Sequence, residues 1–223
     1  MTKRHPIYTA AARDWTKRPS QSVYISTTDT AKLIRATLKD KFPRTKFSVK
    51  SSKYAGGASI SVSWEDGPTA ALVEAHVEAF AGSGFDGMCD MKYAVGAWLS
   101  PEGRATFRQT AGTQGNGVVE AASAETETDG AIPVRFSADS VHCSRATSLE
   151  HMRRSLRSYA AKWPGCPLSD AILEGRVGVQ ESRWGGWEFT GNPGMIRDAV
   201  GDGSQYGGDI ALTSHAGRRM TAA

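Results

Sequence analysis

The sequence predicts an α+β protein built on a small antiparallel sheet, with amphipathic helices packed on one face and irregular, glycine-rich flanks. Two runs of alternating polar and apolar residues are joined by a Gly-Gly turn, which is typical of a hairpin. Apolar residues spaced three and four apart predict helices before and after that hairpin. Because a lone hairpin is marginally stable, helices laid across one face are needed to complete the core.

Composition divides the chain into three parts. Residues 1–20 are basic and contain two prolines, and we expect a disordered arm. Residues 21–165 are predicted to form a single α+β domain with a mobile insertion at about 100–130, where acidic and glycine-rich sequence lacks periodicity. Residues 166–223 are predicted to be an irregular extension with glycines and tryptophans, ending in a disordered tail from about residue 200.

The first half of the domain reads as helix, strand, strand, helix. Residues 22–27 form an edge strand or an extended lead-in to a helix that begins at Asp29 or Thr30 and ends before Pro43. Its apolar stripe comprises Ala31, Ile34, Leu38 and Phe42. The strands of the hairpin are expected at 46–51 and 59–64, where alternate residues are apolar.

The run Asp66-Gly67-Pro68-Thr69 indicates a second helix start, with Asp66 at or near the N-cap and the helix ending at Gly82. Its predicted buried side comprises Thr69, Leu72, Val73, His76, Val77 and Phe80. His76 is interpreted as a core or boundary histidine, because no second histidine lies at a metal-ligand spacing.

Residues 85–93 mix carboxylates, aromatics, methionines and a thiol, and two interpretations stay open. In the structural one, Phe85 and Met88 plug a core while Asp86 caps neighbouring backbone N–H groups. In the functional one, Asp86, Asp90 and Lys92 bind a partner or ligand.

The second half begins with strands at 132–136 and 139–144, the first at a sheet edge because it contains Pro133. His142 and Cys143 are not a catalytic dyad, since neighbouring strand residues point to opposite faces. Helices are expected at 147–163 and 168–175. The aromatic residues that follow form a small strand, a stacking platform for bases or a contact with the core; they are Trp184, Trp187 and Phe189.

The net charge of +4 and pI of about 9.0 suggest an acidic partner. The charge is unevenly distributed, at +10 for residues 1–64, −8 for 65–130 and +2 for 131–223. The alternative interpretation is that these charges only solvate helix and strand faces. The predicted partner- or nucleic-acid-binding residues are Arg35, Lys39, Lys46, Lys50, Lys53, Arg153, Arg154 and Arg157.

The motifs of common enzyme classes do not occur in the sequence. It has no P-loop, no G-x-S-x-G and no H-E-x-x-H, so we expect no catalytic residues, no metal site and no cofactor. Three cysteines without a C-x-x-C pair indicate reduced thiols. The sequence shows neither a signal peptide nor a long apolar run, so we expect a cytoplasmic protein with no membrane partner.

The segment WEDGPTAALVEAHVEAF is followed by FDGMCDMKY and preceded by KFSVKSSKYAGGASISVSW. These residues resemble the large polyvalent protein-associated domain family numbered twenty-nine, over 28–95 and the strand-like segment at 132–145. The resemblance implies an α+β domain carried by phages, plasmids and integrative elements, and it supplies no catalytic residues. Residues after 165 have no counterpart in the family.

The resemblance implies that a mobile element carries the protein as an accessory. We expect a non-enzymatic inhibitor of the anti-defence class, of anti-CRISPR or anti-restriction type, that binds a host protein or nucleoprotein complex through charged surfaces. The first alternative is an accessory protein that binds DNA or RNA directly. The second is a metal-dependent enzyme using Asp86 and Asp90, since hard cations take carboxylate oxygens.

Overall fold

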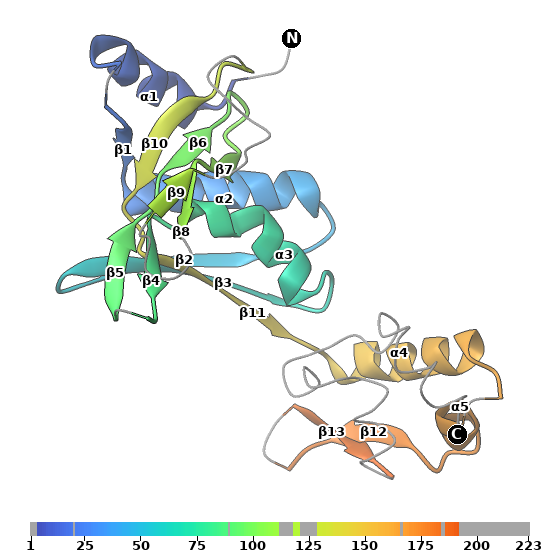
Figure 1. Ribbon diagram of the computed structural model, residues 1–223. Helices are drawn as coiled ribbons and strands as arrows, with labels where there is room; N and C mark the ends of the chain where they lie inside the picture. Colours follow the sequence, from blue (N-terminus) through green and yellow to red (C-terminus); the bar gives the residue numbers. More distant parts are fainter. Residues whose placement is uncertain are drawn as a thin grey trace. The chain divides into compact units, whose positions relative to one another are not determined.

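The computed structural model of the 223-residue chain describes residues 4–19, 21–88, 90–111, 118–120, 129–165, 167–183 and 186–191. Its helical elements are α1 (Pro6–Lys17), α2 (Thr27–Lys41), α3 (Ala70–Val77), the 3-10 turn η1 (Glu78–Phe80), α4 (Leu149–Lys162) and α5 (Pro167–Leu173). Helices and strands alternate without a repeated βαβ order, which confirms the predicted α+β class (Figure 1). No helix within the described ranges has the length and apolarity needed to cross a bilayer.

The strands belong to several small sheets rather than to the one antiparallel sheet that the sequence predicts. They are β1 (Val23–Ile25), β2 (Ser48–Tyr54), β3 (Gly57–Glu65), β4 (Ser83–Asp86), β5 (Met91–Ala94), β6 (Ala97–Leu99), β7 (Ala105–Phe107), β8 (Gln109–Ala111), β9 (Val118–Glu120), β10 (Ile132–Phe136), β11 (Ser140–Ala146), β12 (Gly178–Glu181) and β13 (Trp187–Thr190). One sheet has the order β1-β10-β6-β7 and another has the order β11-β3-β2. The remaining sheets are two-stranded hairpins, and the pairing of β1 with β10 is parallel.

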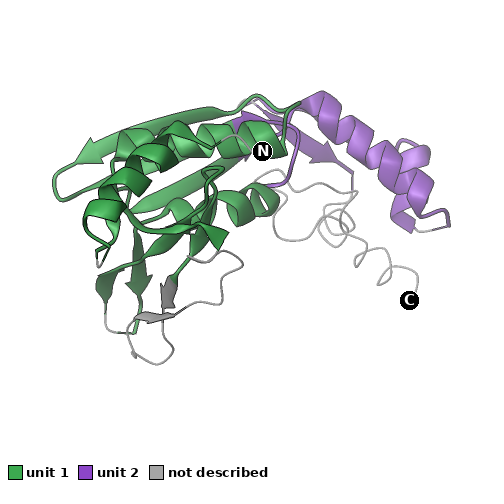
Figure 2. Ribbon diagram, turned by 90° about the horizontal axis from the view of Figure 1, so that it is seen from above, with its two compact units in different colours: residues 1–63, 70–144 green, residues 64–69, 145–223 purple. Residues whose placement is uncertain are grey.

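The chain forms two compact units (Figure 2). Unit 1 comprises residues 1–63 and 70–144, and unit 2 comprises residues 64–69 and 145–223, as far as they are described. The predicted boundary at residue 165 is therefore replaced by one at residue 145. The reason is that α4, which the sequence suggests as part of the first domain, packs on α5 and β12 instead.

Residues 6–17, predicted to be disordered, form helix α1. Pro6 occupies the first turn, where its missing N–H is not needed, and His5 Nδ1 accepts the Ile7 N–H at 3.2 Å. Tyr8 and Ala11 are buried, and the Tyr8 hydroxyl donates to the Gly130 carbonyl at 2.5 Å. The short apolar stripe at steps of three and four, obscured by the surrounding basic residues, is enough to dock this helix.

Helix α2 and the hairpin of β2 and β3 form the predicted first-half core of unit 1. Ser26 is the N-cap in place of the predicted Asp29 or Thr30, and its hydroxyl accepts the Asp29 N–H at 3.2 Å. In the hairpin, Val49 lies opposite Val62, and both are buried. Helix α2 contacts β2 and α3 (Figure 1). The helix packing on one hairpin face is as predicted.

Strand β10 lies inside its sheet, between β1 and β6, although Pro133 predicts an edge. The parallel ladder begins with Val23 opposite Val134, so Pro133 precedes it. On the other side Pro133 lies opposite Trp98 in the antiparallel ladder. A missing N–H at this point removes no bond to β1, which explains why an interior strand tolerates the proline.

Residues 83–94, predicted as a loop, form the hairpin of β4 and β5. Asp86 accepts the Met88 N–H at 2.9 Å, which confirms the predicted backbone cap. Phe85 and Met88 do not plug a core, because their exposed fractions are 64% and 83%. Leu72 of α3 is likewise exposed, at 49%, because the helix is short and turns only Val73 and Val77 inward.

The predicted mobile insertion at 100–130 contains strands β7, β8 and β9. Part of that interval, residues 112–117 and 121–128, lies outside the described residues, as do Cys89, Cys166, Trp184 and the predicted tail at 200–223.

Unit 2 has a hydrophobic core of its own. Trp187 and Phe189 pack edge to face, with ring centroids 5.1 Å apart, and both lie against that core. This arrangement supports the packing interpretation of these two aromatic residues. The buried members of the core are Met152, Leu156, Tyr159, Leu168, Ala171, Val177 and Val179.

Candidate functional site

A groove runs along strand β1 on the surface of unit 1. It consists of three hollows that share lining residues and have volumes of about 510, 360 and 460 Å³, a size that suits small ligands or parts of polymers. Tyr24 lines all three hollows, Ser22 lines the first two, and Arg135 lines the second and third. We call this surface the β1 groove. The other charged residues that line it are Asp14, Lys17, Arg18, Lys92 and Asp139, and Tyr93 lines it as well.

Strand pairing sets Tyr24 and Arg135 side by side at the centre of the β1 groove. The two residues are register partners in the parallel ladder, so their side chains project from the same face of the sheet. The neighbours of Tyr24 project from the opposite face, where Ile25 is buried. Tyr24 therefore stays 67% exposed although its strand belongs to the core sheet.

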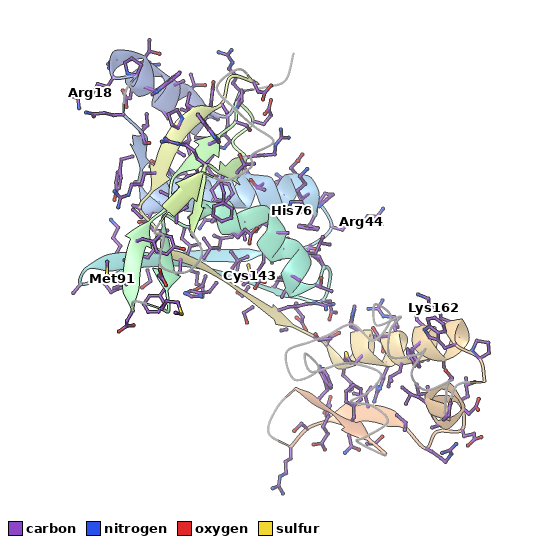
Figure 3. The ribbon with its side chains drawn as sticks, viewed as in Figure 1. Arg18, Arg44, His76, Met91, Cys143 and Lys162 are labelled. Carbon is purple, nitrogen blue, oxygen red and sulfur yellow. The ribbon has the colours of Figure 1, made fainter. Side chains whose placement is uncertain are left out.

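The β1 groove has cationic side chains along its length. Arg18 projects outward at the end of α1 (Figure 3). Lys17 lies 3.6 Å from Asp14, and both side chains are largely exposed, so this pair is weak. Among the described residues neither Arg18 nor Arg135 forms an ion pair. Their charges are therefore available to an anionic ligand.

A second aromatic residue and a second arginine lie on the same sheet face as Arg135. Trp98 lies opposite Pro133, and Pro133 is two residues before Arg135 along β10. The Arg108 guanidinium lies over the Trp98 ring, 5.7 Å from its centroid, and donates to the Ser22 hydroxyl at 3.2 Å. This bond places the Arg108 charge next to the β1 groove.

Asp139 fixes one end of the β1 groove through four donors. Its Oδ1 accepts from Lys92 Nζ at 2.6 Å and Ser83 Oγ at 3.1 Å. Its Oδ2 accepts from Tyr54 Oη at 3.0 Å and the Ala58 N–H at 3.3 Å. Burial disfavours the charged carboxylate, but these hydrogen bonds outweigh burial and hold the pKa of Asp139 below its ordinary value.

The eight predicted basic residues are divided between the two units. Five belong to unit 1 and three, on α4, belong to unit 2. Within unit 1, Lys50 lies opposite Ser61 on the open face of the hairpin, whereas Lys53 lies opposite Ala58 on the core face. The Arg35 guanidinium donates to the Val49 carbonyl and so ties α2 to β2. None of the eight lines the β1 groove.

The three predicted residues of the 85–93 segment all belong to the β4–β5 hairpin and its turn. Of the three, only Lys92 lines the β1 groove. Asp90 has a φ of 52°, the left-handed conformation that aspartate tolerates in turns. No group of three or more His, Cys, Asp or Glu side chains able to hold a metal ion occurs within the described parts of the chain.

Cys143 is a poor nucleophile in this fold. Burial, with a smaller effect from the charge of Glu74, raises the pKa of its thiol to about 11. His142 Nε2 is instead within 2.8 Å of the Ser140 hydroxyl on the same strand. These contacts agree with the sequence-based interpretation of His142 and Cys143 as separate residues.

In unit 2 the turn at Asp66 joins the start of α4. Asp66 has a φ of 57°, and its carboxylate accepts both the N–H and the hydroxyl of Ser148, each at 2.8 Å. Ser148 caps α4 by accepting the His151 N–H at 3.1 Å. Asp66 therefore supports α4. It is not the N-cap of α3, the helix that follows it, although the sequence suggests that role. Because its hydroxyl is bound on both sides, Ser148 is a structural cap.

Sequence reasoning missed the central residues of the β1 groove. Tyr24 and Arg135 each occupy the outward position of a predicted strand, and that alternation was the available signal. Their proximity depends on a parallel pairing between segments far apart in the chain, which no local pattern reveals.

The comparisons with known proteins identify one family. The model of large polyvalent protein associated domain 29 matches residues 25–148, which is more than half of the chain. The match includes all of β10 but only the last residue of β1, Ile25. No curated protein and no solved structure matches the chain.

Proposed function

Because the chain belongs to the large polyvalent protein associated domain 29 family of mobile-element-associated domains, we propose that it is a non-enzymatic accessory protein that acts by binding nucleic acid. The nucleic acid is either free or part of a host nucleoprotein complex. The observation that carries this proposal is the β1 groove, where Arg18 and Arg135 flank the exposed ring of Tyr24.

The charges of the β1 groove suit a phosphate backbone. Its lining contains the cations Lys17, Arg18, Lys92 and Arg135 against the carboxylates of Asp14 and Asp139. Each carboxylate is paired with a lysine, so the two arginines determine the excess positive charge. Arginine also presents planar donors that can bind two phosphate oxygens at once, which the point charge of a lysine cannot do.

Salt dependence tests the proposal. The full chain is titrated into labelled DNA and RNA between roughly 50 and 200 mM salt, where phosphate contacts weaken steeply. The double variant Arg18→Ala, Arg135→Ala is expected to bind more weakly and to reduce the slope of log affinity against log salt by up to about 2.

The matched control is Lys39→Ala, Lys50→Ala, which removes the same charge from exposed positions outside the β1 groove. The control is expected to lose much less affinity. If the full chain binds neither DNA nor RNA at low salt, the proposed function is wrong. If both double variants lose affinity equally, the β1 groove is not the interface.

An anti-defence role, of anti-CRISPR or anti-restriction type, is the second candidate. It is supported by the family's association with mobile elements and by the uneven charge along the chain. An incoming plasmid subject to host restriction or CRISPR cleavage should then transform cells expressing the protein more efficiently than cells lacking it. Unchanged transformation in both systems would remove this candidate and leave nucleic-acid binding untouched.

A further inference from the structure

We propose that the β1 groove holds a single nucleic-acid strand, with a base stacked on Tyr24 and the adjoining phosphates bound by Arg18 and Arg135. The inference rests on the proposed function and specifies the form of nucleic acid and how it is recognised. It follows from the position of Tyr24, the cations around it and the occupied acceptors of Asp139.

The side chain of Tyr24 lies at the surface of the β1 groove. Tyr24 is 67% exposed at the middle of the edge strand β1, so most of its side chain is open to solvent. It lines every hollow of the β1 groove, so a ligand that follows the groove meets its side chain. Exposed aromatic rings on a sheet surface are the platforms on which unpaired bases stack.

Rings and guanidinium groups alternate on the same sheet face. Tyr24 lies beside Arg135 in the parallel register, and the Arg108 guanidinium lies over Trp98. Planar guanidinium groups stack with bases as well as binding phosphates, so the face offers both contacts. Arg18 adds a phosphate contact at the far end of the first hollow.

Single strands and duplexes differ in whether their bases are free to stack on a protein side chain. In a duplex both faces of a base are covered by neighbouring base pairs, so an aromatic ring gains nothing by stacking unless the base is extruded. A ring at the centre of a groove is useful to a strand whose bases are already unpaired. Tyr24 therefore favours single strands even though a duplex has the higher density of phosphate charge.

The sugar of a bound strand would meet the acceptors that line the β1 groove. Asp139 supplies the carboxylate in the lining of the third hollow, and a carboxylate is one acceptor that a 2′-hydroxyl can use. Its two oxygens already accept from Lys92, Ser83, Tyr54 and the Ala58 N–H, which fills the capacity of a carboxylate. Asp139 therefore offers no acceptor for a 2′-hydroxyl, and DNA and RNA strands are expected to bind alike.

Fluorescence anisotropy with the full chain tests the inference. The probes are a labelled DNA strand of about 16 nucleotides, the RNA strand of the same sequence and the corresponding DNA duplex, at one salt concentration. The two single strands are expected to bind within about threefold of one another, and the duplex about tenfold or more weakly. Tyr24→Ala should weaken single-strand binding by about 5- to 100-fold. Tyr24→Trp, which keeps an aromatic ring, should bind single strands like the unmodified protein.

Phe85→Ala is the matched control, because Phe85 has a similar exposed fraction, 64%, and lies outside the β1 groove. It should leave binding unchanged, and circular dichroism should show that both alanine variants stay folded. Duplex binding as tight as single-strand binding, or equal losses in Tyr24→Ala and Phe85→Ala, would overturn the inference while leaving nucleic-acid binding itself intact. Absence of binding to any probe would instead contradict the proposed function.

Discussion

Asp139 connects four strands through its side chain. Its donors come from the β2–β3 hairpin and from both strands of the β4–β5 hairpin. The main chain adds to this, because the Asp139 N–H donates to the Ala58 carbonyl at 2.7 Å. Gly57 is required beside it, since a Cβ at that position would lie 2.0 Å from Asp139 Oδ2. One carboxylate thus holds together one end of the β1 groove.

The pKa of Asp139 sets the pH range over which its carboxylate stabilises unit 1. Burial disfavours its charge, but the hydrogen bonds from Lys92, Tyr54, Ser83 and the Ala58 N–H lower the pKa below the ordinary 3.8. The folded state therefore binds a proton less readily than the unfolded state. The stabilisation is complete above the unfolded pKa and is lost as the pH falls through the folded one.

Asp139→Asn should lower the free energy of unfolding of unit 1 by about 1–3 kcal/mol at pH 7, because an amide cannot accept all four bonds. Urea denaturation measures this loss, and the difference from the unmodified protein should shrink below pH 3.8. Asp14→Asn is the control, since Asp14 belongs to an exposed pair and should change stability by less than about 0.5 kcal/mol. A pH-independent difference would show that the charge of Asp139 is not responsible.

The turn at Asp66 and Gly67 connects two elements rather than starting one. Both residues have positive φ, 57° and 68°, and the Asp66 N–H donates to the Ala146 carbonyl at 2.8 Å. The Arg145 guanidinium, only 7% exposed, donates to the Gly67 carbonyl at 3.0 Å. The turn is therefore held on both sides, and its carboxylate lies at the positive end of the α4 dipole.

Asp66→Ala should destabilise the first turn of α4 by about 1–3 kcal/mol, since it removes both bonds to Ser148 and places a Cβ residue at positive φ. Asp66→Asn, which tolerates that conformation and keeps one acceptor, should lose less. Hydrogen exchange of the amides at the start of α4 gives the measurement. Glu65→Ala, at an exposed neighbouring position, is the control. Exchange in Glu65→Ala as fast as in Asp66→Ala would rule out a capping role for Asp66 at the start of α4.

The elements that local patterns predicted well are those with long apolar periodicity. Helix α4 follows from the spacing of Met152, Leu156 and Tyr159, all of which are buried. The hairpin of β2 and β3 follows from strict alternation, as in the pair Val49 and Val62. Periodicity identifies the buried side of an element without reference to its partner, so these predictions did not depend on the rest of the fold.

Predictions failed where an element depends on a distant partner. Asp66 is satisfied by Ser148, and the helix-start pattern at 66–69 gives no sign of that residue. Helix α1 is fixed by Tyr8 against Gly130, whereas its own composition suggests disorder. The same applies to the β1 groove, because Tyr24 and Arg135 meet only through a parallel ladder. The eight basic residues that the sequence suggests as binding residues do not line this groove.

The two units have separate cores, which determines how the whole chain should unfold. In the described part of unit 2, seven buried residues form its core, and none of them lines the β1 groove. Unit 1 contains the β1 groove complete, with every lining residue in 1–63 or 70–144. Loss of unit 2 packing should therefore leave the groove's own contacts in place.

Leu156→Ala, at a position 3% exposed in the unit 2 core, should lower the stability of that unit by about 2–5 kcal/mol. Calorimetry should show one transition shifting to lower temperature while another stays fixed, and single-strand binding should be unchanged. Leu72→Ala, an exposed leucine of unit 1, provides the control and should shift neither transition by much. A common shift of all transitions would mean that the units unfold together.

The parallel ladder between β1 and β10 also fixes a sequence of events during synthesis. Val23 leaves the ribosome more than a hundred residues before its partner Val134. At roughly 5 to 20 residues per second, the nascent β1 waits roughly 5 to 20 s for that strand. Helix α2 and the β2–β3 hairpin can form in the meantime from local contacts. A chain that stalls before residue 134 would emerge with Tyr24 but without the strand that makes it part of a groove.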